Sequence, residues 1–438
     1  MSKLKEKKKS FSIIELFKDK KQLKNELIAG CTAFVAISYI IIVNPMILKD
    51  AGIPIGYSVC ATIFSSAIGC FLMAFWAKAP IVMTPGMGIN AFFTYTIVNG
   101  MQLSWQEAIA ISICSSIVYF VIAISGFSMQ LAKAIPDNLK TGITAGIGLF
   151  LVELGLEKAH LIQAGGKQGL LMMGDLSQPA TLLGVVGLIM SLIFYLRGTP
   201  GGFLLGIILT TVLSLIFHIQ DQMTTTKLHF SEFQTYFKNI GPGDFREFFS
   251  LPFILAVFSM SMILIFESMG ILSGILPNKK RFKQSFQSSS VASFISGFLG
   301  TSPTVVAAES AVGIESGGRT GGMAFVAGCL FLVAIFTTPF LALIPQVATA
   351  PVIIITGAIM MQQLRTIDLF DFSEWFPAFL IVVLISFSNS ISFGLAIGFI
   401  SYPIVKVAVG QRASIHPIVY GLASLFLIDL ICQAVLLQ

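Results

Sequence analysis

Long apolar runs separated by short polar segments dominate the sequence from residue 27 onward. A run of about twenty apolar residues is the length that an α-helix needs to cross a bilayer. Two runs are too short to cross, and each follows a stretch that looks extended, at 80–87 and 301–307. With these two counted as broken crossings, the pattern predicts fourteen segments, at residues 27–48, 56–77, 88–99, 106–126, 141–157, 179–196, 202–218, 251–276, 286–299, 308–317, 321–344, 347–362, 375–388 and 391–409.

Residues 300–319 are the most informative of these stretches. Pro303 and several β-branched residues are followed by Ala-Ala-Glu-Ser-Ala, a short helical sequence that stops at Gly317 and Gly318. Backbone that is not helical at membrane depth is stable only where protein buries it or where it lines a water-filled cavity. A half-helix that starts there presents free N–H groups near the middle of the bilayer, which is typical of a transporter's binding site.

Composition indicates a polytopic membrane protein. The chain has 438 residues, of which 55% are hydrophobic and 11% charged, and its mean hydropathy is +0.88. Soluble domains carry about 25% charged residues, and an outer-membrane barrel would show alternating strands rather than continuous apolar runs. The six cysteines lie within apolar runs without a Cys-x-x-Cys pair, and the four histidines are scattered, so neither a disulfide framework nor a metal site is indicated.

The distribution of positive charge predicts the orientation. With the N-terminus inside, the predicted inside loops hold 12 lysines and arginines and the outside loops 6; the basic tail, residues 1–26, raises the inside number to 21. Positive residues favour the cytoplasmic side, so a cytoplasmic tail is favoured over a nucleic-acid-binding arm, and no signal peptide is expected. The apolar stretch 414–438 fits either an interfacial helix or a further buried segment.

The two halves of the chain share a weak internal repeat. Residues 34–44 align with 257–267 at an offset of 223, and the same offset places Gly86 over Glu309. Seven crossings per half is an odd number, so the second copy must be inverted across the membrane. Inverted repeats that are interrupted at matching positions are the best sequence indication of a substrate site near the membrane midplane.

Two acids at membrane depth are the leading candidates for chemistry. Glu267 lies in an otherwise uncharged span, where an ionised and unpaired carboxylate costs at least about 2.5 kcal/mol; it is expected to anchor substrate or carry a proton, the alternative being a structural bond to a neighbouring helix. Glu309 begins a short helix whose N-terminal end favours negative charge, the alternative being a helix cap without a ligand. Two acids in different surroundings can divide donor and acceptor roles. Glu315 is expected to pair with Arg319.

The matching stretch of the first half supplies small and polar groups. Gly86 and Gly88 remove side chains where a helix start must approach a ligand, and Asn90 offers a donor and acceptors. Phe92 or Phe93 could stack on a planar ring, but aromatic residues are abundant here, so core packing is the favoured interpretation for either one alone. The predicted substrate-binding set is Glu267, Glu309, Asn90, Gly86, Met87, Gly88, Ser310 and Ser38, with Glu267 and Glu309 as the proton-coupling residues.

This set suits a small, planar and mostly neutral solute. An inorganic anion would need a nearby cation, and no lysine or arginine is expected inside a span. An anion or dicarboxylate carrier is the alternative among transporters. An intramembrane enzyme would need a paired-acid metal motif or a nucleophile with its base, and no histidine is expected inside a span; no cofactor or nucleic-acid partner is indicated.

Four motifs of the sequence resemble the adenine/guanine/hypoxanthine permease branch of the nucleobase:cation symporter-2 family, and the similarity runs from about Leu27 to Pro417. The motifs are Met83-Thr-Pro-Gly-Met-Gly-Ile-Asn-Ala-Phe-Phe-Thr-Tyr, Phe266-Glu-Ser-Met-Gly-Ile-Leu, Glu309-Ser-Ala-Val-Gly-Ile-Glu-Ser-Gly-Gly-Arg-Thr-Gly and Ser392-Phe-Gly-Leu-Ala-Ile-Gly-Phe-Ile-Ser-Tyr.

The resemblance implies an all-α uracil-permease fold: fourteen transmembrane segments in two inverted sevens, with short strands and half-helices in segments 3 and 10. It implies a core domain (27–126 and 251–345) and a gate domain (141–218 and 347–409), followed by a C-terminal apolar segment (410–438). It further implies proton-coupled uptake of a purine nucleobase held by Glu267 and Glu309. The implied protein lies in the inner (plasma) membrane with a cytoplasmic N-terminus, in contact with lipid and with a second copy as a homodimer.

Two departures from the family pattern bear on the substrate. The acid of the eighth segment is usually Asp in a Phe-Asp-Thr-x-Gly setting, whereas this chain has Phe266-Glu267-Ser268. The family's hydroxyl-rich run before the tenth-segment acid has become Thr301-Ser-Pro-Thr-Val-Val-Ala-Ala, which lacks a hydroxyl and a tyrosine. Both differences are expected to alter which base fits.

Overall fold

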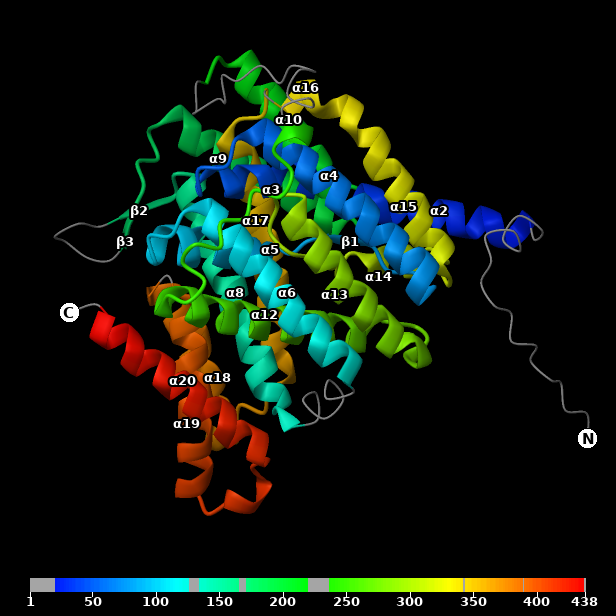
Figure 1. The fold of residues 1–438 in the computed structure, drawn as a ribbon. Helices are drawn as coiled ribbons and strands as arrows, with labels where there is room; N and C mark the ends of the chain where they lie inside the picture. Colours follow the sequence, from blue (N-terminus) through cyan, green and yellow to red (C-terminus); the bar gives the residue numbers. More distant parts are fainter. Residues whose placement is uncertain are drawn as a thin grey trace, which may run out of the picture.

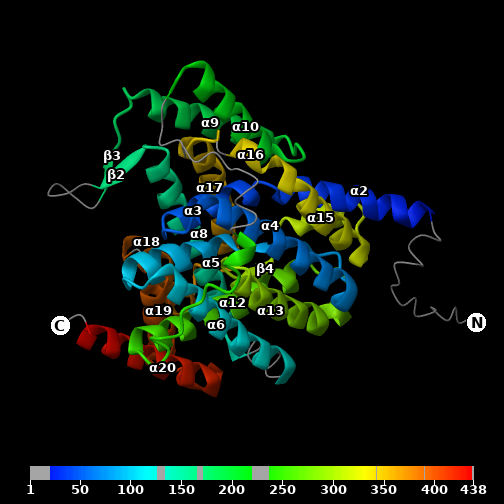
Figure 2. The same cartoon turned by 45° about the horizontal axis from the view of Figure 1, so that its top comes forward.

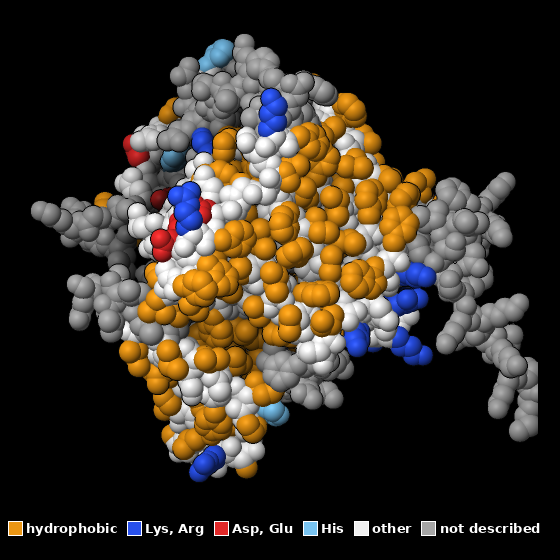
Figure 3. Space-filling view, viewed as in Figure 1, with side chains coloured by type: hydrophobic (Ala, Val, Ile, Leu, Met, Phe, Trp, Pro, Cys, Tyr) orange, Lys and Arg blue, Asp and Glu red, His pale blue; other side chains and the backbone are white. Residues whose placement is uncertain are grey.

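The computed structural model describes residues 20–125, 134–164, 171–219, 236–341, 343–388 and 390–436. Most of these residues are helical, and eight of their helices are long and apolar enough to cross a membrane. The face shown in Figure 3 is covered by hydrophobic side chains, with lysines and arginines toward its edges, as expected of a surface that contacts lipid. The chain is therefore an integral membrane protein; residues 1–19 of the predicted basic tail lie outside the described residues.

Helices occupy all fourteen predicted segments. In the first half they are α2 (Lys20–Ile37), α3 (Ile40–Lys49), α4 (Ile55–Leu72), η1 (Met73–Ala77), α5 (Met87–Ala91), η2 (Phe92–Gly100), α6 (Trp105–Ser125), α8 (Asp137–Lys158), α9 (Pro179–Leu196) and α10 (Gly202–Ile216). In the second half they are α12 (Leu251–Ile275), α13 (Phe282–Phe298), α14 (Ser310–Glu315), α15 (Gly321–Val333), η5 (Ala334–Thr337), α16 (Thr338–Leu341), α17 (Gln346–Met361), α18 (Phe372–Ser388), α19 (Ile391–Ala408) and α20 (Pro417–Leu436).

The C-terminal helix α20 covers most of residues 414–438, which the sequence predicts to be either an interfacial helix or a further buried segment. It packs against α19 and α12, where the Phe426 ring lies 5.1 Å from that of Phe399 and 4.9 Å from that of Phe258. Figure 1 shows α20 lying across α19 on the outside of the bundle. The segment is thus a helix packed on the fold, with one face left exposed.

Two crossings are broken by strands where the sequence predicts extended stretches. Strand β1 (Met83–Pro85) precedes α5, and β4 (Thr304–Val306) precedes α14. The two strands pair antiparallel, with Met83 opposite Val306. Figures 1 and 2 place these strands, α5 and α12 near the middle of the molecule. A second two-stranded sheet, β2 (Ile162–Ala164) with β3 (Leu171–Met173), lies in the loop that follows α8.

Side chains of neighbouring helices form hydrogen bonds with the backbone groups at the outer edges of the buried strands. The Met83 backbone N–H donates to Cys70 Sγ of α4 at 3.3 Å. On the other strand, the Thr304 backbone N–H donates to Ser296 Oγ at 3.0 Å, and Ser293 Oγ donates to the Thr304 carbonyl at 2.8 Å. Because an unpaired backbone group in a membrane interior costs several kcal/mol, these bonds explain how extended backbone survives there.

The helices α8 and α17 approach closely at two glycines. A Cβ added to Gly148 would lie 2.6 Å from the carbonyl oxygen of Gly357, and one added to Gly357 would lie 2.4 Å from the carbonyl oxygen of Gly148. Any larger residue at either position would therefore push the two helices apart. Small residues at such crossings are how membrane helices bring their backbones together.

Candidate functional site

Glu267 projects from the middle of α12 toward the start of α5. A Cβ added to Gly86 would lie 3.1 Å from Glu267 Oε1, and one added to Gly88 would lie 3.6 Å from Oε2. The Oε2 atom is buried and has no hydrogen-bond partner in the described part of the chain. The predicted glycines thus make room for a carboxylate that keeps a free acceptor atom.

Glu309 lies at the other broken crossing, immediately before α14. It does not cap that helix with its side chain. Its Oε1 atom instead accepts a hydrogen bond from the Tyr39 hydroxyl at 2.5 Å. Glu267 faces the start of α5, which follows β1, and Glu309 follows β4, the strand that pairs with β1. The paired strands thus connect the two broken crossings at which these acids lie.

The other predicted site residues differ in how much of their polar capacity is already used. Asn90, in α5, accepts a hydrogen bond from Ser302 Oγ at 2.5 Å, and its Nδ2 has no partner among the described residues. Met87 is 8% exposed at the first position of α5. Ser38 donates to the Val35 carbonyl at 3.1 Å. Only the amide of Asn90 therefore keeps a donor without a described partner.

Ser310 supports the strand rather than offering a free hydroxyl. It accepts from the Val82 backbone N–H at 2.9 Å and donates to the Ala307 carbonyl at 2.7 Å. The rings of Phe92 and Phe93 are completely buried in the core, so the core-packing role that the sequence left open describes both rings.

Two contacts of the site were not predicted. Tyr39 lies in the sequence beside the predicted Ser38, yet its bond to Glu309 spans 270 positions, and Ser302 reaches Asn90 across 212. A tyrosine in an apolar span is compatible with ordinary packing, so its residue type gave no reason to single it out. A hydroxyl-bearing residue next to a predicted polar site residue was the one signal available.

The expected ion pair between Arg319 and Glu315 is not formed in the described structure. Arg319 donates from its guanidinium to the Ile314 and Gly318 carbonyls. Its backbone N–H instead donates to Glu26 Oε1 at 3.0 Å. The acid that serves this turn thus comes from α2, far away in the sequence.

The expectation that no cation lies inside a span is also wrong. Lys406, in the last turn of α19, is 2% exposed and contacts Glu374 Oε1 at 2.6 Å. The span 391–409 was predicted correctly, but Lys406 was counted with the loop that follows. The nearby Asp371 lies before α18, where the Ser373 hydroxyl lowers the pKa of its carboxyl group.

Asp368 and Asp371 have the Asp-x-x-Asp spacing of some metal motifs. Asp368 accepts from the Phe370 backbone N–H at 3.0 Å, and Asp371 from the Ser373 hydroxyl at 2.7 Å. No group of three or more histidines, cysteines or acids among the described residues could hold a metal ion. The pair therefore orders the turn before α18.

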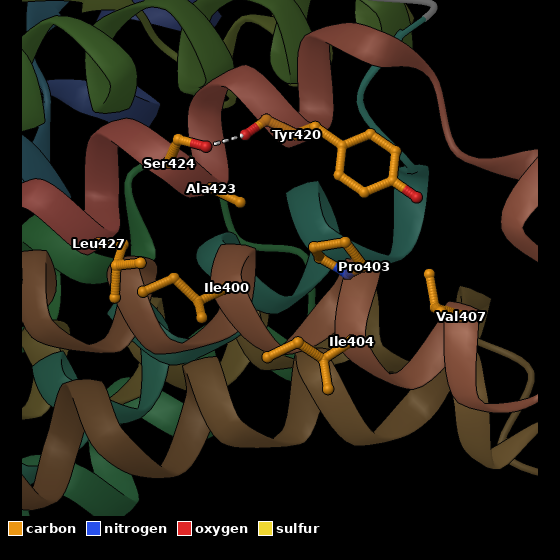
Figure 4. A pocket seen from close by; sticks show the side chains of 8 residues that line it. All are labelled: Ile400, Pro403, Ile404, Val407, Tyr420, Ala423, Ser424 and Leu427. Atoms are coloured by element: carbon orange, nitrogen blue, oxygen red, sulfur yellow. Dashed lines mark hydrogen bonds between the residues drawn. The ribbon is translucent and has the colours of Figure 1, made fainter.

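A shallow apolar groove lies elsewhere, between α19 and α20. It has a volume of about 440 Å³ and is lined by residues that include Ile400, Pro403 and Tyr420. Figure 4 shows these side chains on the facing sides of the two helices, with Ser424 bonded to the Tyr420 backbone. The groove contains neither of the two central acids, so it is separate from the candidate site.

Comparison with curated proteins gives relatives that align over most of their length. The chain is 40% identical to the nucleobase transporter PlAzg2 of Paenibacillus larvae, covering 86% of this chain and 76% of the relative. It is 33% identical to the guanine/hypoxanthine permease PbuO of Bacillus subtilis, over 93% and 97% of the two chains. It is 32% identical to the adenine permease AdeP of Escherichia coli, over 93% of each chain.

Solved structures share the fold at low sequence identity. The transmembrane domain of the cyanobacterial bicarbonate transporter BicA matches with a TM-score of 0.62 at 17% identity, over 87% of this chain and 98% of that one. The murine anion transporter Slc26a9 matches with a TM-score of 0.67 at 11% identity, over 93% and 74%. The family model described as the Permease family (Xan_ur_permease) matches residues 24–397. The chain therefore belongs to this Permease family of nucleobase:cation symporters, as its motifs indicated.

Proposed function

We propose that this protein is a secondary active transporter that takes up purine nucleobases together with protons. The observation that carries the proposal is the Glu267 carboxylate, whose buried Oε2 has no partner in the described structure and which faces the start of α5. A buried acceptor without a partner is costly, so a ligand that supplies an N–H donor there is favoured.

Purine bases match this arrangement chemically. They are planar, carry N–H donors on their edges, and are mostly neutral, so a carboxylate can accept from them without a second charge in the site. The Asn90 amide adds a donor for a ring nitrogen or carbonyl oxygen. The printed names of PbuO and AdeP, a guanine/hypoxanthine and an adenine permease, support the same class of substrate.

Glu267 and Glu309 are the proposed proton carriers. An acid that is buried in one conformation and hydrated in another changes its affinity for a proton between the two, which is what coupling requires. The two acids have different surroundings, because Glu309 accepts from Tyr39 whereas Glu267 Oε2 has no described partner. That difference allows one acid to hold the base while the other releases its proton.

We propose an architecture of fourteen crossings in two inverted sevens. The strand register supports it: Met83 pairs with Val306, and these residues are separated by 223 positions, the offset that aligns the two halves. A two-fold axis that relates the halves would pass between two equivalent residues that face each other in this way.

The proposed core domain comprises residues 27–126 and 251–345, and the proposed gate domain residues 141–218 and 347–409. Movement of one domain against the other would expose the site to each side in turn. The positive-charge distribution supports a cytoplasmic N-terminus in an inner (plasma) membrane. A homodimer, implied by the family resemblance, stays a prediction.

An anion carrier on the same fold is not favoured. The buried lysines of the described structure are Lys158 and Lys406, and each contacts a carboxylate at 2.6 Å, Asp50 and Glu374 respectively. Neither lysine leaves a positive charge for an anionic substrate.

Uptake of labelled guanine, hypoxanthine and adenine tests the proposal, in cells that lack their own purine permeases. The wild-type protein should accumulate at least one base, and a protonophore should abolish the accumulation. Glu267→Gln should reduce uptake at least about tenfold, because it removes the charged acceptor. Glu315→Gln is the control: it makes the same change at an exposed position, at the end of α14, and should behave like wild type. No uptake of any purine by the expressed wild-type protein would refute the proposal.

A further inference from the structure

Tyr39 connects the candidate site to the first crossing, at the junction of the two helices that form it. It lies between the end of α2 at Ile37 and the start of α3 at Ile40, and it is completely buried. Its hydroxyl donates to Glu309 Oε1 at 2.5 Å. Because Glu309 comes from the tenth predicted segment, this one bond joins two elements that the backbone leaves far apart in sequence.

A second contact fixes the orientation of the tyrosine. Its ring meets the Phe203 ring of α10 edge to face, with ring centroids 5.5 Å apart and an interplanar angle of 90°. Edge-to-face packing of this kind adds about 0.5–1.5 kcal/mol beyond the burial of area. The hydroxyl therefore has a defined position, and the carboxylate oxygen that it binds has one too.

The two acids of the site differ in the hydrogen bonds that the protein gives them. At the offset of 223 that aligns the halves, the counterpart of Tyr39 is Met262, which has no hydroxyl. The same offset places Gly86 at the position of Glu309, so the Tyr39–Glu309 bond has no counterpart in the other half. Glu267, for its part, keeps a buried Oε2 without a partner in the described structure. One acid is thus held by the protein, and the other is left with an unused acceptor.

We propose that Tyr39 is a positioning residue for purine recognition and that it sets which base the site prefers. By occupying Oε1, it fixes the rotation of the Glu309 carboxylate and directs the remaining acceptor capacity toward the base. A fixed acceptor discriminates between bases whose N–H donors lie at different places on the ring, because a misplaced donor leaves a carboxylate lone pair unused. This inference rests on the proposed function.

Equilibrium binding of guanine, hypoxanthine and adenine to the purified full-length protein tests the inference. Tyr39→Phe keeps the ring on Phe203 and removes only the hydroxyl. It should weaken binding of the preferred base about tenfold, the usual effect of losing a hydrogen bond to a charged group, and it should change the ratio of affinities between bases. In a Glu309→Gln background, the same change should have less than about a twofold effect, since the charged partner is gone.

A matched control exists outside the candidate site. Tyr95 donates to Asp50 Oδ2 at 2.6 Å, so Tyr95→Phe removes the same kind of bond outside the candidate site. Any shift in conformational populations that Tyr95→Phe causes scales the affinities for all bases alike. This variant should therefore leave the ratio of affinities between bases unchanged. If Tyr39→Phe does not give folded protein, Phe203→Leu, which loosens the tyrosine ring, should move the ratio in its place.

Three results can be distinguished. A changed ratio in Tyr39→Phe that vanishes in the Glu309→Gln background supports the inference. A wild-type protein that binds purines and a Tyr39→Phe variant with the same affinities, or equal effects in both backgrounds, would overturn the inference alone. A folded wild-type protein that binds no purine would overturn the proposed function and this inference with it.

Discussion

At the scale of single residues, the candidate site depends on the absence of side chains as much as on their presence. Glu267 fits against α5 because Gly86 has no Cβ; one added there would lie 2.7 Å from Val305 Cγ2 and 3.1 Å from Glu267 Oε1. The first distance is shorter than atoms tolerate, so the strand residue or the acid would have to move. Gly86 therefore belongs to the site because its missing side chain leaves room for the Glu267 carboxylate.

Gly86→Ala is expected to weaken purine binding while the protein still folds. The new methyl group would displace the Glu267 carboxylate by a few tenths of an ångström, and a loss of affinity on the order of tenfold follows from one distorted charge-assisted bond. Binding to the purified variant measures this. Gly270→Ala, one turn further along α12, meets nothing within 4 Å and should bind like wild type; equal affinities for both variants would contradict the expectation.

Residue type explains which site residues the sequence could predict. Glu267 and Glu309 stand out because a charge interrupts an apolar run, and Gly86 and Gly88 because glycines precede a short helix. Tyr39 and Lys406 do not stand out in this way. The first is an aromatic residue in an apolar span, and the second lies in the last turn of α19, where the helix boundary decides whether a lysine counts as a loop residue.

At the scale of elements, the strands β1 and β4 set the geometry from which both short helices start. The sequence predicted each extended stretch, since proline and β-branched residues disfavour a helix there, but it could not predict that the two stretches pair. Pairing depends on contacts between residues more than 200 positions apart. The same holds for the serines of α13, which look like ordinary small packing residues until Ser296 is seen to accept the Thr304 N–H.

Ser296→Ala should destabilise the protein by about 1–3 kcal/mol, because it leaves a buried backbone N–H without its partner. Thermal unfolding of the purified protein measures the loss as a lower melting temperature. Ser290→Ala provides the control on the same helix, since that hydroxyl donates only to the Gln287 carbonyl of α13 itself. A melting temperature that falls as much in the control would show that the strand bond is unimportant.

At the scale of the whole molecule, an ion pair that contains a buried lysine joins the two proposed domains. Lys158, at the end of α8, contacts Asp50 Oδ2 at 2.6 Å, and Tyr95 of η2 donates to the same oxygen. Asp50 and Tyr95 lie in the proposed core domain and Lys158 in the proposed gate domain. With the proposed cytoplasmic N-terminus, this cluster lies on the outer side. A movement that opens the outer side must therefore separate the lysine from the carboxylate.

Asp50→Asn is accordingly expected to favour the outward-open conformation. The substitution leaves the Lys158 ammonium, whose side chain is 7% exposed, without its charged partner in the closed form. An unpaired buried charge is strongly unfavourable, so a conformation that hydrates the lysine gains population, on the order of tenfold for the loss of one charge-assisted bond. A Met87→Cys substitution, in a background without native cysteines, reports this change: the new thiol should react faster with a membrane-impermeant maleimide added outside.

Asp137→Asn is the control, because its pair with Lys140 lies within α8 and its own side chain is 94% exposed. Labelling of Asp50→Asn at the wild-type rate would mean that the ion pair does not hold this side closed.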